Sequence, residues 1–169
     1  MDVAQAWGAV AGSVVRTGRL LARRQLRMPR TLVGQALTAE DGTCSTVFRE
    51  TVRVGGGSAD PVVLVVRFRL RWIGAAPWAH AVFRRTCVVN TPLFAGFPGF
   101  VSKLWLTDTV SGVYRGLYEW NGAARAERYA ARLRRVLALV TVPGSVGHLV
   151  VPGTDRRPYV TGERAFPPA

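Results

Sequence analysis

The sequence predicts an α+β domain in which two helices cover one face of an antiparallel, ferredoxin-like sheet with the order βαββαβ. Three observations support this fold class. Residues 62–72 alternate between an apolar face and a second face, as a strand does. Residues 97–122 contain two strand-like segments on either side of Ser111-Gly112, which is typical of a turn. Residues 122–140 are rich in Ala, Arg and Leu, which is typical of a long helix.

Proline and glycine separate the remaining elements of this domain, which spans residues 61–153. Pro77 can begin a helix, because its missing amide hydrogen is not needed in the first turn. Asn90-Thr91-Pro92 can end that helix, and Asn90 is most simply interpreted as its stop. The predicted order is a strand at 62–72, a helix at 78–89, strands at 100–107 and 112–120, a helix at 122–140 and a strand at 146–151.

Residues 1–60 form an extension outside this order. Apolar residues at helical spacing predict an amphipathic helix over 2–27 that Pro29 ends. Residues 43–54 alternate as a strand, and the glycines at 55–57 end it in a turn. The apolar stripe of the helix consists of Val3, Trp7, Val10, Val14 and Leu21. We expect this stripe to pack on its own domain or on a second subunit, with contact to a membrane surface as the less favoured alternative.

The C-terminal tail, residues 154–169, is polar and rich in proline. Such a composition is typical of a segment that is loose or draped over a neighbouring molecule.

The composition is that of a globular protein with a formal net charge of +13, and all but one of its 23 basic residues are arginine. This charge can attract nucleic acid, anionic lipid or an acidic substrate, but interspersed acidic residues favour an ordinary solvated surface. No apolar run approaches the roughly 20 residues that cross a bilayer. Cys44 and Cys87 lack a CxxC or Cys/His partner, so we expect buried free thiols in the reducing cytoplasm.

Three segments carry a family resemblance. Residues 98–105 read Pro-Gly-Phe-Val-Ser-Lys-Leu-Trp, residues 112–120 read Gly-Val-Tyr-Arg-Gly-Leu-Tyr-Glu-Trp, and residues 123–129 read Ala-Ala-Arg-Ala-Glu-Arg-Tyr. Together they resemble the YdhR-like branch of the antibiotic-biosynthesis monooxygenase-like proteins, which are dimeric α/β barrels. The chain departs from that pattern at Ser111, where the first of two paired glycines would stand. The resemblance covers roughly residues 62–153.

The resemblance implies a homodimer whose two sheets pack into a shared barrel, with an apolar cavity between sheet and helices in each subunit. It implies a small-molecule enzyme of a biosynthetic pathway. Cofactor-independent oxygenation of an aromatic or polyketide-like substrate is the first expectation, and a cofactor-free cyclase or isomerase is the second. A non-catalytic dimeric ligand-binding or structural protein is the alternative from another class, because a fold does not determine a reaction.

The candidate catalytic residues are aromatic, amide and imidazole side chains that can donate hydrogen bonds or accept a proton. Trp105 is the residue that the motif itself carries over; the others are candidates by type: Asn90, His148 and Tyr114. Each also has a structural interpretation, as a packed aromatic, a helix stop or a satisfied strand histidine. The candidate substrate-binding residues are Lys103, His80, Trp78, Phe68 and Tyr118.

Lys103 is the only lysine of the chain. Because it lies two residues from Trp105 on one predicted strand, both side chains point to the same face. It could hold an anionic substrate or an enolate, but snorkelling toward solvent or an ion pair with Glu119 is the favoured interpretation.

No cofactor, metal ion or nucleic acid is expected to bind. Two separated histidines match no ligand spacing, and haem would need an axial ligand such as His80 or His148. The segment 115–120 echoes the third-strand motif of RNA-recognition domains. However, Leu117 and Glu119 stand where that motif needs base-stacking aromatic residues.

Overall fold

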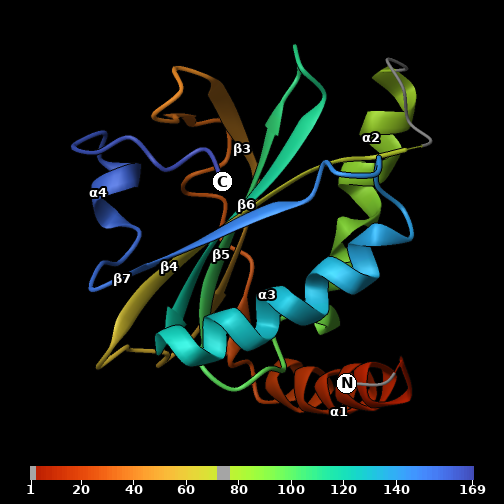
Figure 1. The fold of residues 1–169 in the computed structure, drawn as a ribbon. Coiled ribbons are helices and arrows are strands. Elements are labelled where there is room, and N and C mark those ends of the chain that lie inside the picture. Colours follow the sequence, from red (N-terminus) through yellow and green to blue (C-terminus); the bar gives the residue numbers. More distant parts are fainter. Residues whose placement is uncertain (1–2, 72–76) are drawn as a thin grey trace.

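The computed structural model describes residues 3–71 and 77–169. A single antiparallel sheet forms its centre, with α1, α2 and α3 on one side and α4 with the C-terminus on the other (Figure 1). In chain order the elements are α1 Val3–Ala22, β1 Leu26–Arg27, β2 Ala36–Thr38, β3 Cys44–Arg53, β4 Pro61–Arg69, α2 Pro77–Thr86, the 3₁₀ helix η1 Cys87–Leu93, β5 Phe100–Asp108, β6 Val113–Asn121, α3 Ala123–Ala138, β7 Gly147–Pro152 and α4 Arg157–Val160.

The predicted βαββαβ unit is present as β4, α2, β5, β6, α3 and β7. Its strands lie in the order β7-β4-β6-β5, and every neighbouring pair is antiparallel. This arrangement confirms the ferredoxin-like fold class. The expected helix over 78–89 is shorter as an α-helix, because the chain tightens into η1 from Cys87 onward.

Strand β4 is buried on both faces, which explains its nearly continuous apolar sequence. Val62, Leu64 and Val66 belong to the core beneath the helices. Val63 and Val65 belong to a second core on the opposite face of the sheet. Burying each of these side chains contributes about 1.5–3 kcal/mol. We call the two sides of the sheet the helix face and the tail face.

The first helix ends earlier than the predicted stop at Pro29. Arg24 adopts a left-handed conformation with φ of 54°, and the amide of Gln25 donates to the carbonyl of Leu20. The left-handed residue and this hydrogen bond are the features of a Schellman motif, which ends a helix. Leu26–Arg27 then pairs with β3 instead of continuing the helix. Strand β3 pairs with β5, so the N-terminal extension widens the sheet of the main domain.

The expectation of a loose or intermolecular tail is wrong. The C-terminal segment folds over the sheet of its own chain, where Tyr159 and Phe166 are completely buried. The backbone of Phe166 also bonds to Thr38 and Glu40 beside β2. The tail packs here because its two aromatic side chains fill the tail face, although most of its residues are polar.

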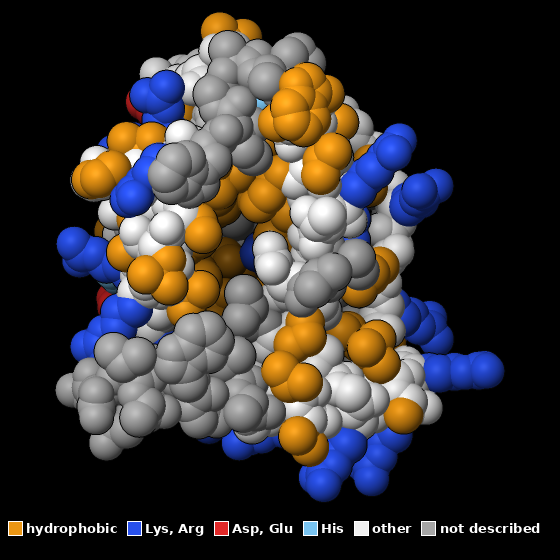
Figure 2. Space-filling model, turned by 90° about the vertical axis from the view of Figure 1, so that its right-hand side faces the viewer, with side chains coloured by type: hydrophobic (Ala, Val, Ile, Leu, Met, Phe, Trp, Pro, Cys, Tyr) orange, Lys and Arg blue, Asp and Glu red, His pale blue; other side chains and the backbone are white. Residues whose placement is uncertain are grey.

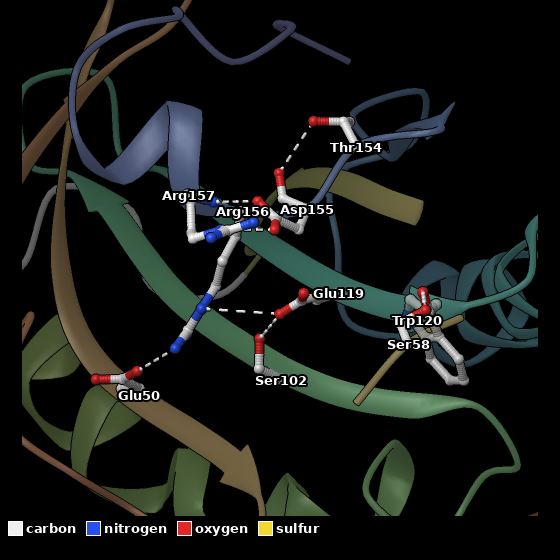
Figure 3. A network of polar contacts seen from close by, with 9 residues as sticks. All are labelled: Glu50, Ser58, Ser102, Glu119, Trp120, Thr154, Asp155, Arg156 and Arg157. Atoms are coloured by element: carbon white, nitrogen blue, oxygen red, sulfur yellow. Dashed lines mark hydrogen bonds and ion pairs between the residues drawn. The ribbon is translucent and has the colours of Figure 1, made fainter. Parts of the chain in front are cut away.

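A buried ion cluster attaches the same segment to the sheet, and Figure 3 shows Arg156 reaching between Glu50 and Glu119. Arg156 Nη2 lies 2.8 Å from Glu50 Oε1, and Arg156 Nε lies 3.8 Å from Glu119 Oε2. The hydroxyl of Ser102 donates to Glu119 Oε2 at 3.0 Å. We call these four residues the Arg156 cluster.

Candidate functional site

An apolar cavity of about 440 Å³ lies between the helix face of the sheet and the helices. Figure 2 shows the side of the molecule that carries α1, α2 and the end of α3, where hydrophobic side chains surround a hollow. The sheet contributes Phe68, Lys103, Trp105 and Tyr118, and the helical segments contribute mainly Phe83, Thr86, Asn90, Phe94, Tyr129 and Leu133.

Strand periodicity places the sheet residues of this cavity. Lys103 and Trp105 lie two residues apart on β5 and both line the cavity, as predicted. Tyr118 stands directly opposite Lys103 on β6, so its ring is a cross-strand neighbour of the lysine. The cavity floor therefore combines an amine with two aromatic side chains.

Three aromatic rings surround the amine of Lys103. Its Nζ atom lies 3.0 Å from the centroid of the Trp105 ring and 4.5 Å from those of Phe94 and Tyr118. Within residues 3–71 and 77–169, no carboxylate pairs with this amine and no acceptor receives a hydrogen bond from it.

The expected ion pair between Lys103 and Glu119 is wrong. Glu119 follows Tyr118 on β6, so its side chain points to the tail face, where it joins the Arg156 cluster. Lys103 is 5% exposed, and none of the described carboxylates lies within ion-pair distance of its amine.

Burial lowers the pKa of Lys103 well below its usual value, and the nearby Cys87 thiol opposes that change only in part. A cation–π contact contributes about 0.5–2 kcal/mol. By contrast, moving an ammonium ion into a low-dielectric interior has an idealised cost of order 20 kcal/mol. Desolvation therefore outweighs the aromatic rings, and the lysine is held toward its neutral, nucleophilic form.

The other ionisable groups around the cavity are also held neutral. Burial raises the pKa of Cys87 to about 11. The hydroxyl of Tyr129 donates to that of Tyr118 at 3.4 Å, and burial raises the pKa of both phenols. Lys103 is thus the group in this cavity whose neutral form can accept a proton.

The remaining predicted cavity residues have different surroundings. Asn90 lies inside η1, which continues to Leu93, so its interpretation as a helix stop is wrong; Asn90 lines the cavity instead. The indole Nε1 of Trp105 is buried and has no hydrogen-bond partner in the described structure. Phe68 lines the same wall from β4.

Two further predicted residues form a pair, of which His80 lines a second, more polar cavity. The hydroxyl of Tyr114 is 2.6 Å from Nδ1 of His80, and their rings are stacked. His80 lines a cavity of about 650 Å³ together with three arginines, Arg69, Arg71 and Arg84. His80 and Tyr114 therefore form a pair outside the apolar cavity, although Leu70 lines both cavities.

His148 and Trp78 lie outside both cavities. His148 is on β7, where its Nε2 atom is 3.3 Å from Glu127 on α3. Trp78 is 73% exposed on α2. His148 lies on an edge strand and Trp78 on the exposed surface of a helix, so neither side chain reaches the apolar cavity.

Sequence reasoning missed Phe94 and Tyr129 as site residues. Tyr129 lies on the buried side of α3, which lines the cavity. Phe94 follows a 3₁₀ helix that no sequence pattern indicated. The prediction of buried thiols holds for Cys87 and is wrong for Cys44, which is exposed; both are free.

The described residues contain neither a cluster of metal ligands nor a membrane-spanning helix. No group of three or more His, Cys, Asp or Glu side chains among them could hold a metal ion. No helix among them combines the length and apolar character needed to cross a membrane.

Two known structures that resemble the chain come from Listeria species, whereas no family model and no curated protein sequence matches the chain. A monooxygenase-like protein from Listeria innocua has 13% identity and a TM-score of 0.45, over 66% of this chain and 64% of that one. The chain thus spans less than two thirds of that protein. An uncharacterized ferredoxin-fold protein from Listeria monocytogenes, related to antibiotic biosynthesis monooxygenases, has 12% identity and a TM-score of 0.43, over 79% and 85%.

Proposed function

We propose that the chain is a small-molecule enzyme that carries out cofactor-independent oxygenation of an aromatic or polyketide-like substrate in the apolar cavity. The observation that carries this proposal is the unpaired amine of Lys103 inside a cavity lined by aromatic side chains. The volume of about 440 Å³ lies within the range of about 300–1,000 Å³ of small-molecule sites.

Oxygenation without a cofactor requires a substrate that forms a stabilised carbanion or phenolate. The neutral amine of Lys103 removes the proton from such a substrate, and the resulting ammonium stands beside the new anion. That pairing gives the newly formed ammonium a counter-charge, which no described carboxylate provides. The substrate anion is then the electron donor and dissolved dioxygen the oxidant.

The hydrogen-bond donors of the site are few and fixed. Asn90 lines the cavity from the helical side and can donate to a carbonyl group of the substrate, whereas the Thr86 hydroxyl donates to the Phe83 carbonyl at 3.0 Å and can only accept from a substrate hydroxyl. The phenols of Tyr118 and Tyr129 bond to one another, which holds the wall behind the substrate.

A cofactor-free cyclase or isomerase is the second candidate, and the same observation favours it. Proton transfer to and from one amine in a shaped cavity is sufficient for such a reaction. The homodimer and the cytoplasmic location implied at the sequence level stay predictions.

Oxygen uptake tests the proposal, with an anthrone as substrate because its ionised form is a stabilised carbanion. We expect uptake above the enzyme-free background, loss of that activity in Lys103→Met and a decrease in Trp105→Phe. Trp120→Phe is the matched control, because Trp120 is a fully buried tryptophan of the same face that does not line the cavity.

Product formation without oxygen consumption would support the cyclase or isomerase instead. Equal uptake by the wild type and Lys103→Met, with both proteins folded, would overturn the oxygenase proposal.

A further inference from the structure

We propose that Lys103 captures its substrate covalently, as an imine, and that the substrate is therefore an apolar aldehyde or ketone. This inference rests on the proposed function, because it names the substrate class and the chemical step of the same cavity. It assigns to the amine a nucleophilic role in addition to proton transfer.

The surroundings of the amine favour this chemistry over ionic binding. A lysine that holds a carboxylate or phosphate would remain charged, and such sites supply further donors around the anion. Here the ring centroids of Phe94, Trp105 and Tyr118 lie 3.0–4.5 Å from the amine. An uncharged amine in an apolar pocket is the activated form of a lysine nucleophile.

The step balances without an added reagent. The amine nitrogen attacks the carbonyl carbon, and a proton moves from nitrogen to oxygen to give a carbinolamine. The C–O bond then breaks, one water molecule leaves, and a C=N bond joins the substrate to Nζ. The lysine and the carbonyl compound are neither oxidised nor reduced.

The cavity suits the product of that step as well as the reactants. A protonated imine is a cation, and the faces of the surrounding rings offset part of the cost of placing it at this position. The charged imine withdraws electrons from the adjacent carbon, and the hydroxide released with the C–O bond can take a proton from that carbon, which yields an enamine and water. An enamine is the carbanion equivalent that cofactor-free oxygenation requires, which links this inference to the proposed reaction.

The lining also defines the ligand that would reach the amine. Phe68, Phe83 and Leu133 offer contacts to a flat apolar body, whereas the polar contribution is limited to groups such as Asn90 and Thr86. Small polar aldehydes would gain little of this contact area. We therefore expect aromatic carbonyl compounds to react in preference to small polar ones.

Reductive trapping with 2-naphthaldehyde and sodium cyanoborohydride tests the inference on the whole chain at pH 7. Lys103 is the only lysine, so peptide mass mapping needs to distinguish it only from the terminal α-amine, which serves as an internal reference. We expect one naphthylmethyl group on Lys103, formed faster than on the α-amine. This modification should be lost in Lys103→Arg, which keeps a long nitrogen-bearing side chain but cannot form the imine.

Two further measurements use the wild type alone, in case the variant does not fold. An excess of 2-methylnaphthalene, which has the same rings but no carbonyl group, should slow labelling of Lys103 and leave the α-amine unaffected. Protein unfolded in urea should lose the preference for Lys103. Labelling of the α-amine alone, or equal labelling of Lys103 in folded and unfolded protein, would overturn the inference.

The outcomes separate this inference from the proposed function. Trapping at Lys103 together with no anthrone-dependent oxygen uptake would support the imine and contradict the oxygenase. Oxygen uptake that needs Lys103, together with no trapping, would support proton transfer alone and overturn the imine.

Discussion

The two faces of the sheet bury charged side chains in opposite ways. On the tail face, Glu50 is 2% exposed and pairs with Arg156 at 2.8 Å. On the helix face, Lys103 is 5% exposed, and no carboxylate among the described residues pairs with it. Burial is nearly the same at the two positions, so the difference lies in the partner.

This difference separates a structural ion cluster from a candidate reactive group. The Arg156 cluster joins residues from β3, β5, β6 and the segment before α4, so it holds distant parts of the chain together. Lys103 forms no ion pair with a described residue, and its burial lowers the stability of the fold. A costly group of this kind is expected where function requires it.

Removing the arginine from the tail face should have the largest effect on stability. In Arg156→Met, Glu50 and Glu119 lose their counter-charge, and breaking a buried pair costs about 3–5 kcal/mol. Urea denaturation should therefore show a decrease of that size in the free energy of unfolding.

Arg157→Met is the matched control for this prediction. Its side chain is 85% exposed and bonds to Asp155 at 2.7 Å, and surface pairs contribute about 0–1 kcal/mol. Equal, small changes in both variants would show that the Arg156 cluster does not hold the tail.

Replacing the lysine on the helix face should have a smaller effect of opposite sign. Lys103→Met keeps an unbranched side chain and removes a buried group without a hydrogen-bond partner, a situation that costs about 1–3 kcal/mol. We expect thermal and urea unfolding to show stabilisation of that order, while the trapping by 2-naphthaldehyde is lost. Destabilisation would mean that Lys103 has a stabilising partner.

The smallest expected effect is the change with pH of the difference in free energy of unfolding between the wild type and Lys103→Met. The pKa of Lys103 is lowered in the folded protein, so between that pKa and the ordinary lysine value of about 10.4 the unfolded chain binds the extra proton. The free energy of unfolding of the wild type should then rise with pH relative to Lys103→Met.

Paired urea denaturations between pH 7 and 9 measure this difference. Cys87, Tyr118 and Tyr129 titrate above that range because burial raises the pKa of each, and they are present in both proteins. A pH-independent difference would mean that the folded lysine titrates normally.

The parts of the fold that depend on local periodicity could be predicted. The alternation of β4, the two strands around Ser111-Gly112 and the long helix α3 all lie close to their expected bounds. The same period of two placed Lys103 and Trp105 on one face. The end of α1 could not be predicted, because a left-handed arginine is an uncommon helix terminator.

Errors about the site arose where distant segments meet. His148 and Trp78 have suitable chemistry, but the positions of β7 and α2 keep them out of the apolar cavity. The hydroxyl of Tyr114 contacts His80 instead, and Tyr114 lines neither cavity. Residue type alone does not indicate which cavity a side chain will line.

The sequence by itself determined the order of the elements and the face on which each strand residue lies, because both follow from spacing between near neighbours. Only the tertiary structure decided which charges are paired. Arg156 reaches Glu50 across more than half the chain, whereas the segments brought to Lys103 by η1 and β6 carry aromatic rings. Pairing depends on contacts between segments far apart in sequence, and periodicity contains no information about those contacts.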